Sequence, residues 1–182
     1  IQAKNAASND ELRPVMQGVL IDTACDVVAI TNAHIMVLYP IEIIEKSSEF
    51  NCSIPLSILN IKGISYHSYL TDFVFRIDIT NGYAYVYEPN ADYLDNTTFL
   101  LRQRIIEGKT PKFLEVFPKE KSQISDIGLN LNILLKLQKA IKTKGSNCNF
   151  KLEFFAKNKP IVFTEMDNED PIKGLIMPIT LP

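Results

Sequence analysis

The chain has 182 residues, of which 46% are hydrophobic and 22% charged, and its formal net charge is −2. This composition is typical of a globular protein with a substantial core, and the net charge excludes a uniformly basic nucleic-acid binder without excluding a local basic face. No run approaches the roughly 20 apolar residues of a membrane span, and the first ten residues lack the apolar segment of a signal peptide. We therefore expect a cytoplasmic protein with no membrane partner.

The predicted elements form three similar α+β units. Val- and Ile-rich runs predict the strands, whereas Pro and Gly positions and apolar periodicity predict the helices. In chain order we expect a short helix at 1–11, strands at 13–24 and 26–43, a short helix at 52–64, a hairpin at 73–89, a strand at 97–106, a connector at 107–118, a strand at 124–130, a helix at 131–145, and strands at 148–157, 159–166 and 172–180. The strand at 26–43 is long enough to bend or split near Asn32, and residues 118–123 are the expected boundary between units.

The hairpin at 73–89 has the strongest turn signal in the chain. Asn81-Gly82 lies between two β-rich runs, and both residues tolerate a positive φ. Tyr83, Tyr85 and Tyr87 alternate along the second strand and therefore share one face. Stacking on nucleic-acid bases and packing across strands both explain this row, and we favour packing.

The helix at 131–145 is expected to be amphipathic and basic. Its apolar residues on one face are Leu131, Leu134, Leu135 and Ile141. Lys136 and Lys139 lie opposite that face, and no acidic residue occurs between Leu129 and Leu152. Such a face can lie along DNA phosphates, and a simply solvated face is the alternative interpretation.

No combination of residues in the sequence indicates catalysis or metal binding. The three cysteines and two histidines (Cys25, Cys52, Cys148, His34 and His67) are widely spaced and form no CxxC or zinc-ligand pattern. P-loop, GxGxxG, GxSxG and HExxH patterns do not occur. We therefore expect free thiols, no metal, no cofactor and no enzymatic activity.

Five segments in order resemble a known family. They are "ELRPVMQGVLID", "VAITNAHIMV", "FLLRQRIIEGKTPKFLEVFP", "IGLNLNILLKLQKAI" and "GLIMPITLP". The corresponding patterns of the bacterial sliding clamp, the β subunit of DNA polymerase III, are R-x-x-L-x-G-V-x-F/L-E, VATDGHRLA, R-L-I-D/E-G-x-F-P-D-Y-x-x-V-L-P, IGFN-x-x-Y-L-L-D-x-L-x-A-L and Y-V-V-M-P-M-R-L. The sequence thus resembles a shortened variant of this clamp family over most of its length.

The resemblance implies an α+β DNA-clamp fold built from βαβββ half-units. It implies about three half-units in this chain, against roughly six in the bacterial protein. Residues 1–118 would correspond to the middle clamp domain. Residues 119–182 would correspond to the second half of the last domain.

The function implied is that of a non-enzymatic processivity factor. Clamps close a ring around duplex DNA, contact its phosphates rather than its bases, and tether a DNA polymerase, so the resemblance implies a homo-oligomer. Under this resemblance the DNA-facing residues are Lys4, Lys136, Lys139 and Lys142. The alternative is an adaptor or regulator that binds clamp-interaction peptides without encircling DNA.

Clamps also bind short hydrophobic peptides of polymerases and clamp loaders in a groove. Carried over by position, the groove residues are Met16, Thr31, Ala33, His34, Ile35, Met36, Pro118, Leu175, Ile176, Met177, Pro178, Ile179 and Leu181. Filling of the core is the alternative role for these side chains. Asn32-Ala33-His34-Ile35 stands where the family has Asp-Gly-His-Arg, and Thr180 replaces the terminal arginine, so the implied groove is more apolar.

Overall fold

The fold is described by a computed structural model that covers residues 2–45, 47–59, 74–87, 99–119, 127–141, 149–166, 169 and 171–179. The strands are β1 (Gly18–Asp22), β2 (Val27–Thr31), β3 (Ile35–Pro40), β4 (Asn51–Pro55), β5 (Val74–Asp78), β6 (Tyr83–Tyr87), β7 (Leu101–Arg104), β8 (Phe150–Glu153), β9 (Ile161–Glu165) and β10 (Lys173–Ile176). The α-helix is α1 (Leu131–Ile141), and four short 3-10 helices are η1 (Gln2–Ala6), η2 (Pro14–Gln17), η3 (Leu56–Leu59) and η4 (Phe113–Val116).

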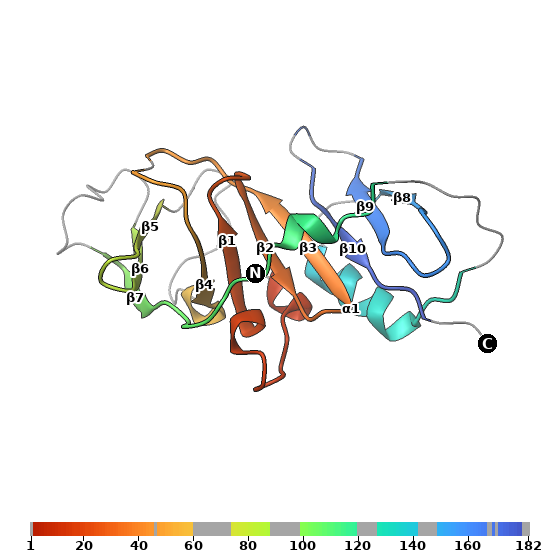
Figure 1. The fold of residues 1–182 in the computed structure, drawn as a ribbon, viewed down its shortest axis with the longest axis horizontal. Coiled ribbons are helices and arrows are strands. Elements are labelled where there is room, and N and C mark those ends of the chain that lie inside the picture. The colour runs from red at the N-terminus through yellow and green to blue at the C-terminus, as the bar shows by residue number, and fades with distance from the viewer. Residues whose placement is uncertain are drawn as a thin grey trace.

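The strands form two antiparallel sheets (Figure 1). The main sheet has the order β4-β1-β2-β3-β10-β9-β8, and the small sheet has the order β5-β6-β7. Pairing of β3 with β10 joins the N-terminal strands to the C-terminal ones in one continuous sheet. The small sheet lies at the end of the molecule away from β8 and β9 (Figure 1).

The main sheet buries both of its faces. Alternation along β3 sends Ile35 and Val37 to a core shared with α1, and sends Met36 and Leu38 to a second core on the other face. The Tyr39 hydroxyl donates a hydrogen bond of 3.1 Å to the Ala140 carbonyl, which fixes β3 to the helix. Burial raises the pKa of Tyr39, so this hydroxyl remains a donor.

Local turn chemistry was predicted correctly at two places. The predicted split near Asn32 is confirmed, because β2 ends at Thr31 and β3 begins at Ile35. The predicted hairpin is also confirmed: β5 pairs with β6, and Gly82 in the turn has a φ of 73°. These turns use residues that form hydrogen bonds locally or accept a positive φ.

Two predicted elements were wrong in type. Residues 14–17, expected at the start of a strand, form the helix η2, because Pro14 has the fixed φ that favours a first helical position. Residues 51–55, expected to lead into a helix, form β4 and pair with β1. Pro55 is the last residue of this edge strand, where a missing N–H donor is tolerated. Of the rest of that expected helix, residues 60–64 lie outside the described residues.

The buried face of α1 differs from the predicted one. Leu131 is 74% exposed and Leu135 is 53% exposed, so the prediction that both are buried was wrong. The side chains that pack into the core are Ile133, Leu134, Leu137, Ala140 and Ile141. Leucines occur around most of this helix, so periodicity alone does not say which side is buried. The side that packs against η1 is the one that includes the small Ala140. The expected strand at 124–130 is reduced, among described residues, to one bridge between Gly128 and Ile179.

Candidate functional site

The tight turn between β2 and β3 is the centre of the candidate groove. The Thr31 hydroxyl donates a 2.7 Å hydrogen bond to the Ile35 carbonyl and accepts the Ala33 N–H at 3.2 Å. The Asn32 side-chain oxygen accepts the N–H groups of His34 and Ile35, both at 3.0 Å. These bonds fix the backbone of the turn and leave the side chains of Ala33 and His34 exposed.

Ala33 occupies a backbone conformation that favours glycine. Its φ is 71°, at the position where the resembled family pattern has Gly. A side chain in this left-handed region costs roughly 1–2 kcal/mol. The hydrogen bonds of Thr31 and Asn32 hold the turn in place against that cost.

The segment after β10 runs beside this turn. Leu175 and Ile176 pair with Met36 and Ile35, respectively. The Met177 N–H then donates a 2.8 Å hydrogen bond to the His34 carbonyl. Beyond Pro178, the Ile179 N–H donates to the Gly128 carbonyl at 3.0 Å, so the chain continues toward the start of α1.

Burial divides the predicted groove residues into two layers. The buried members are Thr31, Ile35, Met36, Leu175 and Ile176, and all of them except the polar Thr31 belong to the two hydrophobic cores. The half-buried or exposed members are Met16, Ala33, His34, Pro118, Met177, Pro178 and Ile179. A peptide can touch the second set directly, and the first set supports it from below. Leu181 lies outside the described residues.

Met16 and Pro118 lie next in the chain to two residues of the second core. These neighbours, Val15 and Phe117, both pack against the cluster that contains Met36 and Leu175. The structure therefore brings η2 and the segment after η4 to the same face of the main sheet.

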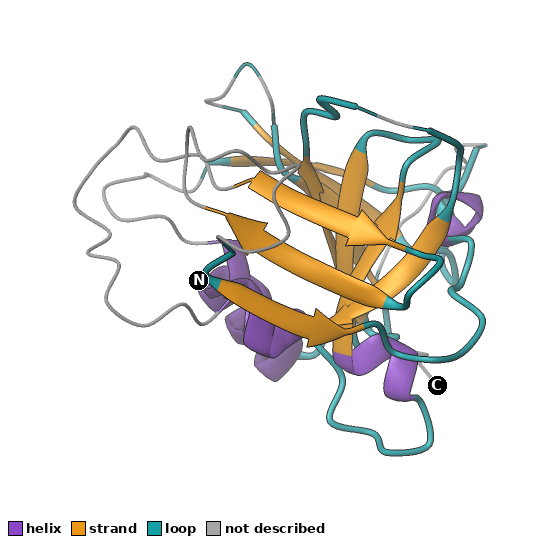
Figure 2. Cartoon of the chain, turned by 90° about the vertical axis from the view of Figure 1, so that its left-hand side faces the viewer, coloured by secondary structure: helices purple, strands orange, loops and turns teal. Residues whose placement is uncertain are grey.

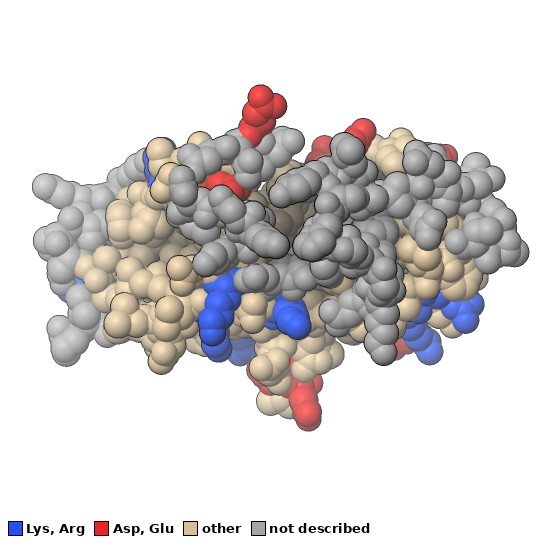
Figure 3. Space-filling model, turned by 180° about the vertical axis from the view of Figure 1, so that it is seen from behind, with Lys and Arg blue, Asp and Glu red and all other residues tan. Residues whose placement is uncertain are grey.

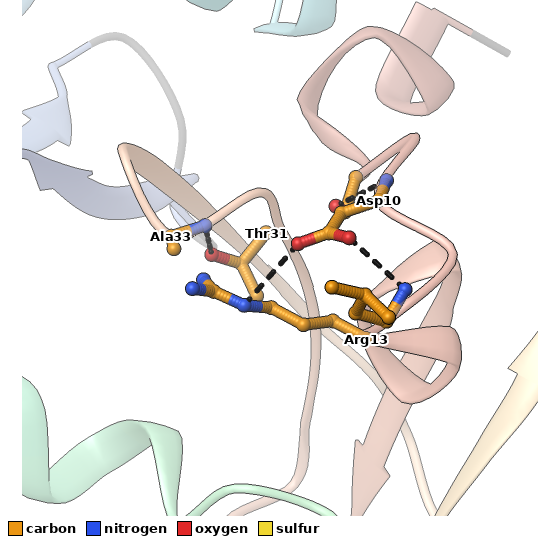
Figure 4. Close-up of polar contacts among 6 residues, drawn as sticks. Asp10, Arg13, Thr31 and Ala33 are labelled. Carbon is orange, nitrogen blue, oxygen red and sulfur yellow. Dashed lines mark hydrogen bonds and ion pairs between the residues drawn. The ribbon is translucent and has the colours of Figure 1, made fainter.

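The sequence-based site omitted Arg13. In Figure 4 its side chain points toward the turn that carries Thr31 and Ala33. Its Nε lies 3.4 Å from a carboxylate oxygen of Asp10, and the Asp10 carboxylate also accepts the Leu12 N–H at 3.0 Å. Arg13 is the first residue of the R-x-x-L-x-G-V-like segment, and that position was the signal that could have identified it.

Two hollows are found on the described part of the chain. One hollow, with a volume of about 710 Å³, is lined by Asp26 and residues 40–45. Another, of about 500 Å³, is lined by residues 109–112, Glu115 and Val116. Neither hollow includes a predicted groove residue, so apolar surface and backbone register define the candidate groove.

Lysines gather where α1 lies against η1. Lys4 on η1 and Lys136 and Lys139 on α1 are all exposed. The Asn5 side-chain amide donates a 3.4 Å hydrogen bond to the Lys139 carbonyl and links the two helices. From behind (Figure 3), most Lys and Arg side chains lie low in the view, while Asp and Glu side chains lie along the upper edge and at one lower projection. Lys142 lies outside the described residues.

The described cysteines are free thiols with little reactivity. Burial raises the pKa of Cys52 to about 12. Partial burial and the nearby Asp22 carboxylate raise the pKa of Cys25. A thiol with a raised pKa is a poor nucleophile at neutral pH. Cys148 and His67 lie outside the described residues.

Among the described residues, no three His, Cys, Asp or Glu side chains are grouped as a metal site. None of the described helices is long and apolar enough to cross a membrane.

Comparison by fold gives consistent matches to bacterial sliding clamps. A Helicobacter pylori beta clamp in complex with diflunisal matches with a TM-score of 0.69 and 17% identity, over 99% of this chain and 62% of that one. The DNA polymerase sliding clamp of Bacillus subtilis matches with a TM-score of 0.67 and 14% identity, over 100% of this chain and 61% of that one. An H. pylori beta clamp bound to a DNA ligase peptide matches with a TM-score of 0.66 and 16% identity, over 99% and 62%. Compared by sequence, the chain matches no protein-family model and no curated protein.

These matches define the chain as a protein with the DNA-clamp fold. These solved structures and that of a DNA polymerase III subunit beta are bacterial clamps, and the likeness confirms the fold that the sequence resemblance implied. The chain spans less than two thirds of their length, because the shares covered are 61% and 62%.

Proposed function

We propose that the protein is a sliding-clamp-like, non-catalytic processivity factor. It embraces or encircles duplex DNA without sequence preference and tethers a DNA polymerase or clamp loader through a hydrophobic peptide groove. The observation that carries this proposal is the pairing of β3 with β10 in a sheet covered by a lysine-bearing helix. That pairing brings the β2–β3 turn and the segment 177–179 together, while α1 presents its lysines on another surface.

The clamp fold of the neighbours supports a groove at this place. One neighbour is described as bound to a DNA ligase peptide. In the present chain, Met177 and the exposed part of the turn offer a pliable apolar contact. Methionine adapts to related partners because its side chain is flexible and polarisable.

Ring formation by this chain requires several copies. About three half-units per chain would give a ring of twelve from about four chains. The described main sheet has two edge strands, β4 and β8. The Ser53 carbonyl of β4 already accepts the Ile106 N–H at 2.8 Å, whereas β8 is followed by Phe154, which is 39% exposed. An edge strand has backbone donors and acceptors that can pair with another copy, so we place a subunit contact at β8.

Loading on DNA of different topology tests the proposal. We expect the protein to be a closed multimer in solution and to be retained on nicked circular DNA but lost from the same DNA after linearisation. Light scattering gives the oligomeric mass, and gel filtration of protein–plasmid mixtures gives retention. A monomer that is indifferent to DNA topology would contradict an encircling clamp.

The adaptor remains a second candidate because of one observation on α1. Leu131 and Leu135 are exposed beside the lysines, whereas a surface that only follows phosphates needs no exposed leucines. An adaptor binds clamp-interaction peptides in the same groove but does not close around DNA. A monomer that binds such peptides and is not retained on circular DNA identifies the adaptor.

The groove is tested by a charge placed in its apolar surface. We expect Met177→Asp to weaken binding of the DNA ligase peptide at least about tenfold, because a carboxylate would lose water beside apolar side chains. His34→Ala should weaken it less. Isothermal titration calorimetry measures both affinities. Met166→Asp is the matched control, since Met166 is 65% exposed at the end of β9. Equal affinity of all three variants and the parent chain would mean that the groove lies elsewhere.

A further inference from the structure

One face of the small sheet carries arginine and aromatic side chains in register. Tyr85 of β6 lies between Arg76 of β5 and Arg102 of β7, and Tyr83 lies opposite Arg104. Side chains two residues apart along a strand point the same way, so these five residues share one face. With Phe99, which precedes β7, they form what we call the arginine–aromatic face.

At Tyr83 and Tyr85 this face is turned away from the core, whereas Tyr87, farther along the same face of β6, is fully buried. On the opposite face of the small sheet, Ala84 and Val86 are fully buried in the core cluster that extends to α1. Arg102 and Arg104 are exposed, and the rings of Tyr83 and Tyr85 are partly exposed. Figure 2 looks toward this end of the molecule, and the three strands of the small sheet lie at the front of the view.

The guanidinium groups are held against the rings. The Arg102 Cζ lies 4.8 Å from the centroid of Tyr83 and 6.0 Å from that of Phe99, and the Arg76 Cζ lies 5.9 Å from the centroid of Tyr85. Tyr85 and Phe99 meet edge to face with centroids 5.4 Å apart. A guanidinium over a ring can still donate hydrogen bonds from the N–H groups at its edge, so the ring contacts of Arg102 orient this side chain without using its donors.

Two described acidic residues, Asp78 and Glu107, lie near this face, toward the end that carries Tyr83 and Arg104. The Asp78 carboxylate accepts two hydrogen bonds from Asn81, at 3.0 and 2.8 Å, which lowers the pKa of Asp78. Glu107 pairs with Arg104 at 3.2 Å. The lowered pKa keeps Asp78 ionised, and Arg104 is paired. Among the described residues no carboxylate forms an ion pair with Arg102, so its guanidinium is the group of this face that can meet an anionic partner.

We propose that the arginine–aromatic face binds single-stranded nucleic acid. Arginine matches phosphate geometry with paired N–H donors, and aromatic rings stack on any base. A row of rings across an antiparallel sheet is an arrangement that accepts unpaired bases. An acidic peptide would use the arginines but not the rings, so the combination favours a nucleic acid. The site is separate from α1 and goes beyond the duplex contacts proposed there.

Fluorescence anisotropy of a labelled oligothymidylate of about 20 nucleotides, at low salt, tests this assignment with the full chain. Thymidylate has no stable secondary structure, so it reports single-strand binding. We expect Arg102→Gln to weaken binding about fivefold and to reduce the salt slope by about 0.7. We expect Tyr85→Leu to weaken it about tenfold through lost stacking.

Two controls separate the chemistry from folding and from overall charge. Tyr85→Phe keeps the ring and should bind within about twofold of the parent chain. Lys159→Gln removes one positive charge from an exposed turn between β8 and β9 and should have no effect on the single strand. Circular dichroism melting confirms that each variant is folded. Arg102→Gln changes an exposed side chain, so it remains informative if Tyr85→Leu does not fold.

The proposal is overturned if the parent chain does not bind the oligonucleotide, or if Arg102→Gln and Tyr85→Leu bind it as the parent does. It is also overturned if polyglutamate binds as tightly and is insensitive to Tyr85→Leu, which would identify a site for acidic peptides. Duplex binding in the same variants should stay at the parent level. The effect of lysine variants of α1 on duplex binding tests the proposed clamp function and not the single-strand site. The two proposals can therefore fail separately.

Discussion

Replacing Gly174 with alanine is expected to destabilise the protein by about 3 kcal/mol, near the upper end of overpacking effects. Gly174 lies in β10 between Val37 of β3 and Phe163 of β9. A Cβ at this position would overlap the Met36 carbonyl oxygen and the Phe163 ring. The carbonyl belongs to the sheet backbone and cannot rotate away, so β10 must shift out of register or move from its neighbours.

Thermal unfolding followed by circular dichroism measures this effect. For a chain of this size, a loss of about 3 kcal/mol corresponds to a fall in Tm of roughly 6–12 °C. Lys173→Ala is the matched control, because Lys173 precedes Gly174 in the same strand and is exposed. A Tm for Gly174→Ala within about 2 °C of this control would show that the strands around β10 are packed less tightly than described.

The Gly174 contact also bears on the groove. β10 pairs with β3 up to Ile176, and the next residue, Met177, bonds to His34. Any shift of β10 therefore moves the apolar segment 177–179 relative to the β2–β3 turn. This coupling explains why a glycine far from the exposed groove residues contributes to their arrangement.

Features decided by short-range chemistry could be predicted from the sequence. The hydrogen bonds of Asn32 and the positive φ of Gly82 lie within their own turns, so the split between β2 and β3 and the hairpin were both predictable. The order of family-like segments gave the clamp fold, because five weak patterns in one order are far more specific than any single one.

Features decided by distant partners could not be predicted. Asn51–Pro55 is a strand because β1, which lies much earlier in the chain, offers an edge. Gly18 of β1, for example, pairs with Pro55. Leu135 was assigned to the wrong face of α1 because periodicity does not say which neighbour covers a helix, and here η1 does. The buried or exposed state of the groove residues likewise depends on the pairing of β3 with β10.

Charge reversal on the lysine-bearing surface is expected to abolish duplex DNA binding. The variant Lys4→Glu, Lys136→Glu, Lys139→Glu changes three exposed side chains on the adjoining helices η1 and α1. If each lysine neutralises one phosphate, the slope of log K against log salt should become shallower by about 2.7, and affinity at about 0.1 M salt should fall at least a hundredfold. Anisotropy of a labelled duplex across a salt series measures both quantities.

A neutral variant and a matched reversal separate charge from stability. Glutamate near the C-terminal end of α1 opposes the helix dipole, so Lys136→Gln with Lys139→Gln provides a milder change in the same place. It should weaken duplex binding by about tenfold while the protein stays folded.

The matched reversal makes the same total change of charge on exposed residues elsewhere, with the substitutions Lys109→Glu, Lys112→Glu and Lys159→Glu. This control should bind far more tightly than the η1–α1 variant, because phosphate contacts act locally within a Debye length of about 10 Å. Equal loss in both reversals would mean that net charge alone governs binding. Unchanged affinity in the η1–α1 variant would remove α1 from the DNA contact and favour the peptide-binding adaptor.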